Sequence, residues 1–245
     1  MKRFLRLYSV EQKLAFRSPD MLLFGVGMPV GILVLISMIA GGKMAGDGYT
    51  YLEGSFASLI AVGICAAAFM GIPLVVADYR DKKILKHFFV TPCSPAVLLG
   101  ANVLTGFMTA VISAIAVSLV SVVAFGYTMS GNVFAFIGAW LLTSVSMFSI
   151  GLLMASLCPT VKATNAVTSL VYFPMLFLSG ATIPFEIFPE GLQKVASVLP
   201  LTQGIKLMKA VSMGIEPDSV GKIVVLLLGI TVVCTGISIK TFQWE

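Results

Sequence analysis

One segment of this sequence, residues 78–95, holds a cluster of charged side chains and lies between two long apolar runs. The segment holds four of the sixteen Lys and Arg residues and the only histidine, His87. Its spacing predicts a short helix with a basic and an apolar side, which the X-Pro pairs at residues 91–95 bring to an end. A basic helix tipped with aromatic rings is too short to be a domain. We interpret it as a binding surface for a partner.

The residue patterns needed for enzymatic or metal chemistry are missing. One histidine cannot supply a His-Glu-x-x-His zinc site, and the four cysteines lack the close pairing of a metal or disulfide framework. Neither Gly-Lys pair continues as a phosphate-binding loop, because Met44 and Ile223 follow them. We therefore expect that this chain binds no cofactor and no metal and that it is not an enzyme. Any ATP and Mg²⁺ would be used by a separate polypeptide.

The elements that must position this segment are membrane helices. Hydrophobic residues make up 58% of the chain and charged residues 11%, and the mean hydropathy is +1.01, whereas about a quarter of a soluble domain is charged. We predict an all-α integral membrane protein in which residues 1–245 form one transmembrane domain. Its six apolar runs are each long enough to cross the hydrocarbon core, and lie near residues 21–41, 56–77, 97–126, 133–157, 164–183 and 223–239.

Basic residues are distributed unevenly between the two sides of such a bundle. With the N-terminus inside, eleven Lys and Arg residues fall on the inner side and five on the outer side. This asymmetry predicts that both termini are cytoplasmic in a multi-pass protein of the cell membrane. The bases are spread over short membrane-flanking segments, so the net charge of +5 does not indicate nucleic acid.

The opening segment, residues 1–19, predicts an amphipathic helix in the inner membrane interface. Its bases share one side and its apolar residues the other, with Val10 and Glu11 as the misfits. Such a helix would contact lipid headgroups through its bases. An ordinary basic tail that fixes the topology is the alternative interpretation.

The outer connection, residues 184–222, is long for a helical bundle and too apolar for a free loop. We predict two short re-entrant helices that dip into the outer leaflet on either side of Pro200.

Small polar residues recur within the third and fourth spans. They could line a conduit for a substrate, or they could be the hydrogen-bonding contacts between packed helices. The interiors of the predicted spans hold no charged residue, which argues against a proton-coupled transporter or a charge-selective channel. The residues concerned are Thr109, Ser113, Ser146 and Ser149.

Three features together resemble the ABC type-2 permeases, the membrane subunits of bacterial exporters. The opening helix resembles the connecting helix of that family, and residues 78–100 are similar to its charged segment, Thr-Pro-x-Ser motif and Leu-Leu-Gly. Residues 173–189 with Leu199-Pro-Leu-Thr202 resemble its fifth span and outer helices. One departure is that Lys83-Ile84 stand where the family often has Gly-Thr.

The resemblance implies a half-transporter that sits on two copies of an ABC ATPase and pairs with a second copy or a related permease. Pro174, Ser179 and Gly180 would shape the outer half of its conduit. The cargo would be hydrophobic or amphipathic: a drug, an antibiotic, a peptide or a lipid-like molecule. The residues that would dock into the ATPase are Arg80, Lys82, Lys83, Ile84, Leu85, Lys86, His87 and Phe88.

Three alternatives stay open at this point. Residues 78–95 could be a solvated positive loop without a partner. The bundle could be a membrane scaffold or immunity protein that moves nothing, or, with less support, a secondary transporter.

Overall fold

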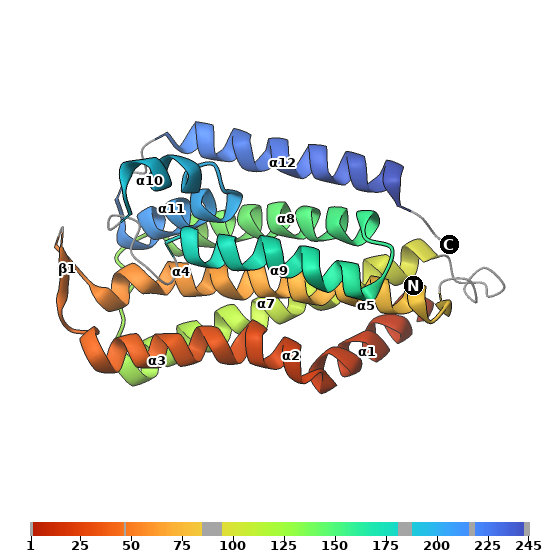
Figure 1. Cartoon of the computed structure of the whole chain (residues 1–245). Helices are drawn as coiled ribbons and strands as arrows, with labels where there is room; N and C mark the ends of the chain where they lie inside the picture. Colours follow the sequence, from red (N-terminus) through yellow and green to blue (C-terminus); the bar gives the residue numbers. More distant parts are fainter. Residues whose placement is uncertain (1, 47, 85–94, 181–187, 216–218, 243–245) are drawn as a thin grey trace.

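The structure, a computed structural model, describes residues 2–46, 48–84, 95–180, 188–215 and 219–242. Within these ranges the chain is almost entirely helical, with one two-stranded hairpin at residues 44–50 (Figure 1). The elements are α1 Lys2–Arg17, α2 Pro19–Leu22, the π-helical turn η1 Leu23–Gly27, α3 Met28–Ala40, β1 Met44–Gly46, β2 Tyr49–Thr50, α4 Tyr51–Ala66, the π-helical turn η2 Ala67–Gly71, α5 Ile72–Asp81, α7 Pro95–Phe125, α8 Val133–Leu157, α9 Val161–Leu178, α10 Glu190–Ala196, α11 Pro200–Met213 and α12 Val220–Thr241.

In the described part of the chain, six helices are long and apolar enough to cross a membrane, which confirms the predicted all-α membrane fold. They run over Leu23–Ala40, Tyr51–Asp81, Val97–Phe125, Val133–Leu157, Val161–Leu178 and Val220–Thr241. The second of them is longer at both ends than the predicted run.

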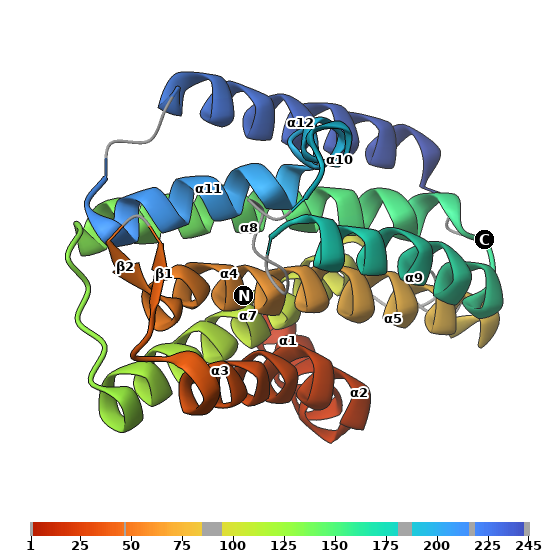
Figure 2. The ribbon, with the colours of Figure 1, turned by 60° about the vertical axis from the view of Figure 1, so that its left-hand side comes forward.

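The continuous helix α4–η2–α5 is the centre of the bundle. In its most hydrophobic stretch 83% of the residues are buried, against 17% in the first and last spans. It packs on α3, α7, α8, α9 and α11, so it has neighbours on every side (Figure 2). Small residues permit this packing: at Gly63 the side chain of Ser113 lies where a Cβ atom would be.

Residues 78–81 do not form a separate helix, as the sequence pattern suggested, but are the last turn of α5. Nothing between Ala77 and Asp78 breaks the helix, and the side chains of its last turn are held by neighbouring helices, as described below. The helix ends where Lys83 adopts a left-handed conformation, with a φ of 56°.

The hairpin and the start of α4 occupy residues 44–51, between the first and second spans. Thr50 caps α4 by accepting a hydrogen bond from the Glu53 amide, and the Glu53 carboxylate accepts from the Thr50 amide at 2.7 Å. This reciprocal capping box starts the helix five residues earlier than the apolar run predicted.

As predicted, two short helices fill the connection between the fifth and sixth spans. The second, α11, packs on α4 and α8 with Leu201, Ile205 and Met208 buried. In the described part of this connection, α11 is therefore a buried helix of the bundle.

The two ends of the chain lie at the same end of the bundle, as an even number of spans requires (Figure 1). Phe4 of α1 and Phe242 after α12 line one cavity there. We call this the inner end, and the end that carries the hairpin, α10 and α11 the outer end. Helix α1 lies across the inner end and packs on α7.

Candidate coupling site and cavities

The last turn of α5 is attached to α1 through Tyr79 and Glu11. The Tyr79 hydroxyl donates to both carboxylate oxygens of Glu11, at 2.7 and 2.8 Å. Glu11 is only 5% exposed although it belongs to an interfacial helix whose Arg6, Lys13 and Arg17 are exposed. Burial raises the pKa of the Glu11 carboxyl above its ordinary value, and the Tyr79 hydrogen bond offsets part of that rise.

The next residue, Arg80, attaches α5 to the end of α8. Its guanidinium donates to the carbonyl oxygens of Ala155 and Cys158, at 3.3 and 2.7 Å. The C-terminus of a helix carries partial negative charge, so a guanidinium is favourable there. The same guanidinium lies 5.4 Å from the ring centre of Phe242, which adds a cation–π contact with the residue after α12.

A third attachment joins α5 to α9. One carboxylate oxygen of Asp81 accepts a hydrogen bond from the Val161 amide, at 3.2 Å, in the first turn of α9. A carboxylate at a helix N-terminus also interacts favourably with the helix dipole. Lys82 turns back to Asp78, with 2.7 Å between its amino nitrogen and the carboxylate oxygen.

These three contacts make the inner end of α5 a junction. A displacement of the segment after Asp81 would act on α1, α8 and α9 together, because each is held by a different side chain of the same helical turn. The same helix continues toward the other end of the bundle through η2 and α4.

The predicted docking residues that the structure describes divide into two groups. Lys82 and Lys83 are exposed and Ile84 is half-buried, whereas Arg80 is half-buried and engaged with α8 and Phe242. Four predicted docking residues lie outside the described ranges: Leu85, Lys86, His87 and Phe88.

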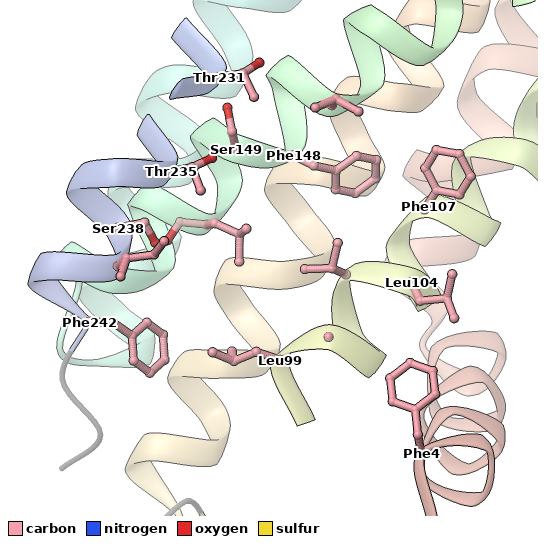
Figure 3. A pocket seen from close by; sticks show the side chains of 15 residues that line it. Phe4, Leu99, Leu104, Phe107, Phe148, Ser149, Thr231, Thr235, Ser238 and Phe242 are labelled. Carbon is pink, nitrogen blue, oxygen red and sulfur yellow. The ribbon is translucent and has the colours of Figure 1, made fainter. Parts of the chain in front are cut away.

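An apolar cavity of about 870 Å³ opens at the inner end between α1, α7, α8 and α12. Figure 3 shows hydroxyl side chains on the side of α12 and α8, and aromatic and leucine side chains facing them from α7, α8 and α1. The hydroxyls of Ser149, Thr231 and Ser238 all donate to helix carbonyl oxygens, at 2.7 to 3.2 Å. Because these groups are already satisfied, the cavity presents a surface that suits a hydrocarbon chain.

An acidic cavity of about 400 Å³ lies on the other side of α7, between α1, α5, α7 and α9. Its polar wall contains Glu11, Asp78, Tyr79, Asn102, Thr105 and Asn165. Its apolar wall includes Met21, Met70, Leu74 and Val75. The two cavities therefore flank the same stretch of α7 with different chemistry.

Three of the predicted conduit residues are buried between helices. The Thr109 hydroxyl donates to the Thr105 carbonyl oxygen at 3.1 Å, and Ser113 packs against Gly63. Ser146 is fully buried in α8. All three lie at buried positions, although the Ser113 and Ser146 hydroxyls have no hydrogen-bond partner among the described residues.

The other four lie in different places. Ser149 lines the apolar cavity, and Pro174 is exposed on the surface of α9. Ser179 is buried and donates to the Leu176 carbonyl oxygen at 3.2 Å, and Gly180 follows with a φ of 82°. Of these seven residues, only Ser149 lines either of the two cavities described above.

Of the residues that build the junction, the sequence analysis singled out Arg80 as a docking residue but gave no role to Tyr79 or Asp81. Tyr79 is an ordinary residue in a helix, and only its pairing with the distant Glu11 gives it a role. Asn102 and Thr105 are notable only because they line the same cavity. One signal was present: Glu11 was a misfit in the pattern of α1, and the structure buries it.

The geometry defines a class. Six candidate spans with an amphipathic helix across one end make a multi-pass membrane protein. Residues 2–213 match the family model described as "ABC-2 type transporter". The chain belongs to this family, as the permease subunit of an ABC transporter, and permeases of the family work with an ATPase partner.

Curated relatives agree with this family. "Nodulation protein J" of Rhizobium leguminosarum bv. viciae is 25% identical over 197 residues, which are 80% of this chain and 72% of that protein. "Nodulation protein J" of Rhizobium meliloti (strain 1021) is 28% identical over 197 residues, 80% of this chain and 71% of that protein. "Inner membrane transport permease YhhJ" of Escherichia coli (strain K12) is 24% identical over 133 residues, 54% of this chain and 36% of that protein.

Proposed function

We propose that this chain is the membrane subunit of an ATP-driven exporter, oriented with its inner end in the cytoplasm. The observation that supports this most is the junction at the end of α5. Three consecutive residues at the start of the charged segment, Tyr79, Arg80 and Asp81, hold three different helices. A partner that pushes on this segment would move the bundle as a unit, which is what a mechanically driven permease requires.

The partner in this proposal is a cassette ATPase, present in two copies beneath two permeases that are identical or closely related. Lys82 and Lys83 are exposed at the start of the docking segment, and the residues from Leu85 to Phe88 would complete it. ATP and Mg²⁺ would be bound by the ATPase alone. Closure of the ATPase pair would be transmitted through α5 to α1, α8 and α9.

The cargo in this proposal is hydrophobic or amphipathic. The six candidate spans are strongly apolar, and the apolar cavity has hydroxyls that are already hydrogen-bonded to the backbone. A hydrated ion would find few groups there to replace its water.

Leu85→Asp and Phe88→Asp test the docking role. An aspartate on the apolar side of the docking segment should reduce ATPase co-purification about tenfold or more, while the permease still inserts and folds. Val198→Asp is the matched control, because Val198 is 68% exposed and lies between α10 and α11, at the opposite end of the bundle from the end of α5 (Figure 1). ATPase retention equal to wild type in both docking variants would reject the role.

A further inference from the structure

We propose that the acidic cavity binds the cationic group of an amphipathic molecule, with Glu11 as the counter-charge and the methionine-lined wall holding the apolar part. This rests on the proposed exporter function and adds to it the charge of a cargo molecule. The cavity lies at the inner end, between helix α1 and the spans α5, α7 and α9. A molecule in the inner leaflet or the cytoplasm would meet it there.

The first observation is a buried carboxylate without an opposite charge. Glu11 is 5% exposed, and its partner among the described residues is the neutral Tyr79 hydroxyl. No Lys or Arg in the described ranges forms an ion pair with it. A buried anion that lacks a cation is costly, so a bound cation would relieve the cost.

The second observation is an unsatisfied hydroxyl on the facing helix. Thr105 of α7 lines the same cavity and is 4% exposed, and its hydroxyl oxygen has no hydrogen-bond partner in the described part of the chain. Buried polar groups are normally paired, so an orphan that borders a cavity points to a ligand. Asn102, one turn earlier, adds an amide group to this wall.

The chemistry of the walls selects the class of ligand. Glu11 and Asp78 repel an anion, and the lysine that pairs with Asp78 is at the exposed rim. A bare metal ion is a poor fit, because no cluster of three His, Cys, Asp or Glu side chains occurs among the described residues. Met21, Met70 and Leu74 form an adaptable apolar surface, and a cavity of about 400 Å³ is within the range of small-molecule sites.

The test is a binding measurement on the purified full-length permease in neutral detergent, without any ATPase. The probes are three molecules of similar size and different charge: 4-phenylbutylammonium, 4-phenylbutanol and 4-phenylbutyrate. We expect the cation to bind about tenfold or more tightly than the alcohol, and the anion to bind most weakly, because a charged hydrogen bond contributes that much.

Two variants locate the effect. Glu11→Gln keeps an acceptor for Tyr79 but removes the charge, and should abolish the preference for the cation while the alcohol binds as before. Thr105→Val removes only the unpaired hydroxyl and should weaken cation binding about threefold or more, within the range of one hydrogen bond. Glu190→Gln removes an exposed acid at the outer end and should change nothing.

Equal affinity for the cation and the alcohol in the wild type would overturn the proposal, as would a cation preference that survives Glu11→Gln. If Glu11→Gln fails to fold, Thr105→Val decides, because its hydroxyl has no hydrogen-bond partner to lose among the described residues. These outcomes are independent of the exporter proposal, which stands or falls on ATPase co-purification with the docking variants.

Discussion

The two cavities at the inner end show how one helix can separate two chemistries. On one side of α7, three hydroxyls of the apolar cavity, those of Ser149, Thr231 and Ser238, donate hydrogen bonds to backbone carbonyl oxygens. On the other side, the acidic cavity has a carboxylate and a hydroxyl, those of Glu11 and Thr105; among the described residues the first has no cationic partner and the second no hydrogen-bond partner. The apolar cavity suits the acyl chain of any lipid, whereas the acidic cavity suits a ligand with a specific polar group. Satisfied and unsatisfied polar groups, rather than volume, distinguish them.

The wall between the cavities depends on Gly106 of α7. A Cβ atom at this position would lie 2.9 Å from Cε1 of Phe148, which borders the apolar cavity, and 3.6 Å from Cγ1 of Ile72, which borders the acidic one. The absence of a side chain lets the Phe148 ring pack directly against the helix. Four variants test the difference between the two sides, and they are ordered here by expected effect.

Ser149→Glu places an unpaired acid in the apolar cavity and should have the largest effect. Ser149 is 4% exposed, so the new carboxylate would be buried without a partner. We expect a loss of about 3–5 kcal/mol of unfolding free energy, or failure to accumulate. Denaturant titration in detergent measures it, with Ser149→Ala as the control. A glutamate variant as stable as the alanine variant would show that water reaches this cavity freely.

Tyr79→Phe removes the donor that holds Glu11 and should cost about 1.5–3 kcal/mol, as for a hydrogen bond to a charged group. The same titration at neutral pH measures the loss, and faster proteolysis within α1 would locate it. Tyr51→Phe is the control, since Tyr51 is 37% exposed at the outer end. Equal stability of the two variants would contradict a tight attachment of α1 to α5.

Gly106→Ala should cost about 1–3 kcal/mol, because the Phe148 ring must move to admit the methyl group. Gly138→Ala is the matched control in a neighbouring helix, since no atom lies within 4 Å of its Cβ position. Thermal unfolding of both variants gives the comparison. Similar melting temperatures would show that the Phe148 ring moves easily to admit the methyl group.

Glu11→Gln should have a small effect on the free energy of unfolding itself and a clearer effect on how that free energy varies with pH. Burial raises the pKa of Glu11 in the folded protein, so at low pH both folded and unfolded forms are protonated and no cost arises. As the pH rises above the ordinary value of 4.5, the unfolded chain ionises first and the wild type loses stability. The glutamine variant should lack this part of the decline. A parallel decline in both proteins would assign it to other groups.

Much of the fold follows from the apolar runs, because lipid forces the backbone to bond within each helix. The ends of the helices do not follow as well. Helix α5 continues through Asp81 because Tyr79 and Arg80 find partners on α1 and α8, far away in the sequence. No local pattern carries that information.

The site was less predictable than the fold. Hydroxyls at helical spacing serve as packing contacts or as a lining, and only the neighbours decide: Ser113 meets Gly63, whereas Ser149 borders a cavity. Glu11 broke the pattern of its helix, which marked it as unusual, but its partner is 68 positions away. The sequence could mark the residue without giving its role.

Site-specific photocrosslinking in native membranes tests the central claim, that a separate ATPase acts on the end of α5. A photoreactive amino acid at Lys83, which is exposed beside the junction, should give an adduct with a cassette ATPase. The same amino acid at Glu190, exposed at the outer end, should give none. An ATPase adduct at Lys83 alone is the result that the account predicts. No adduct at Lys83 while the transporter is active, or an equal adduct at Glu190, would contradict it.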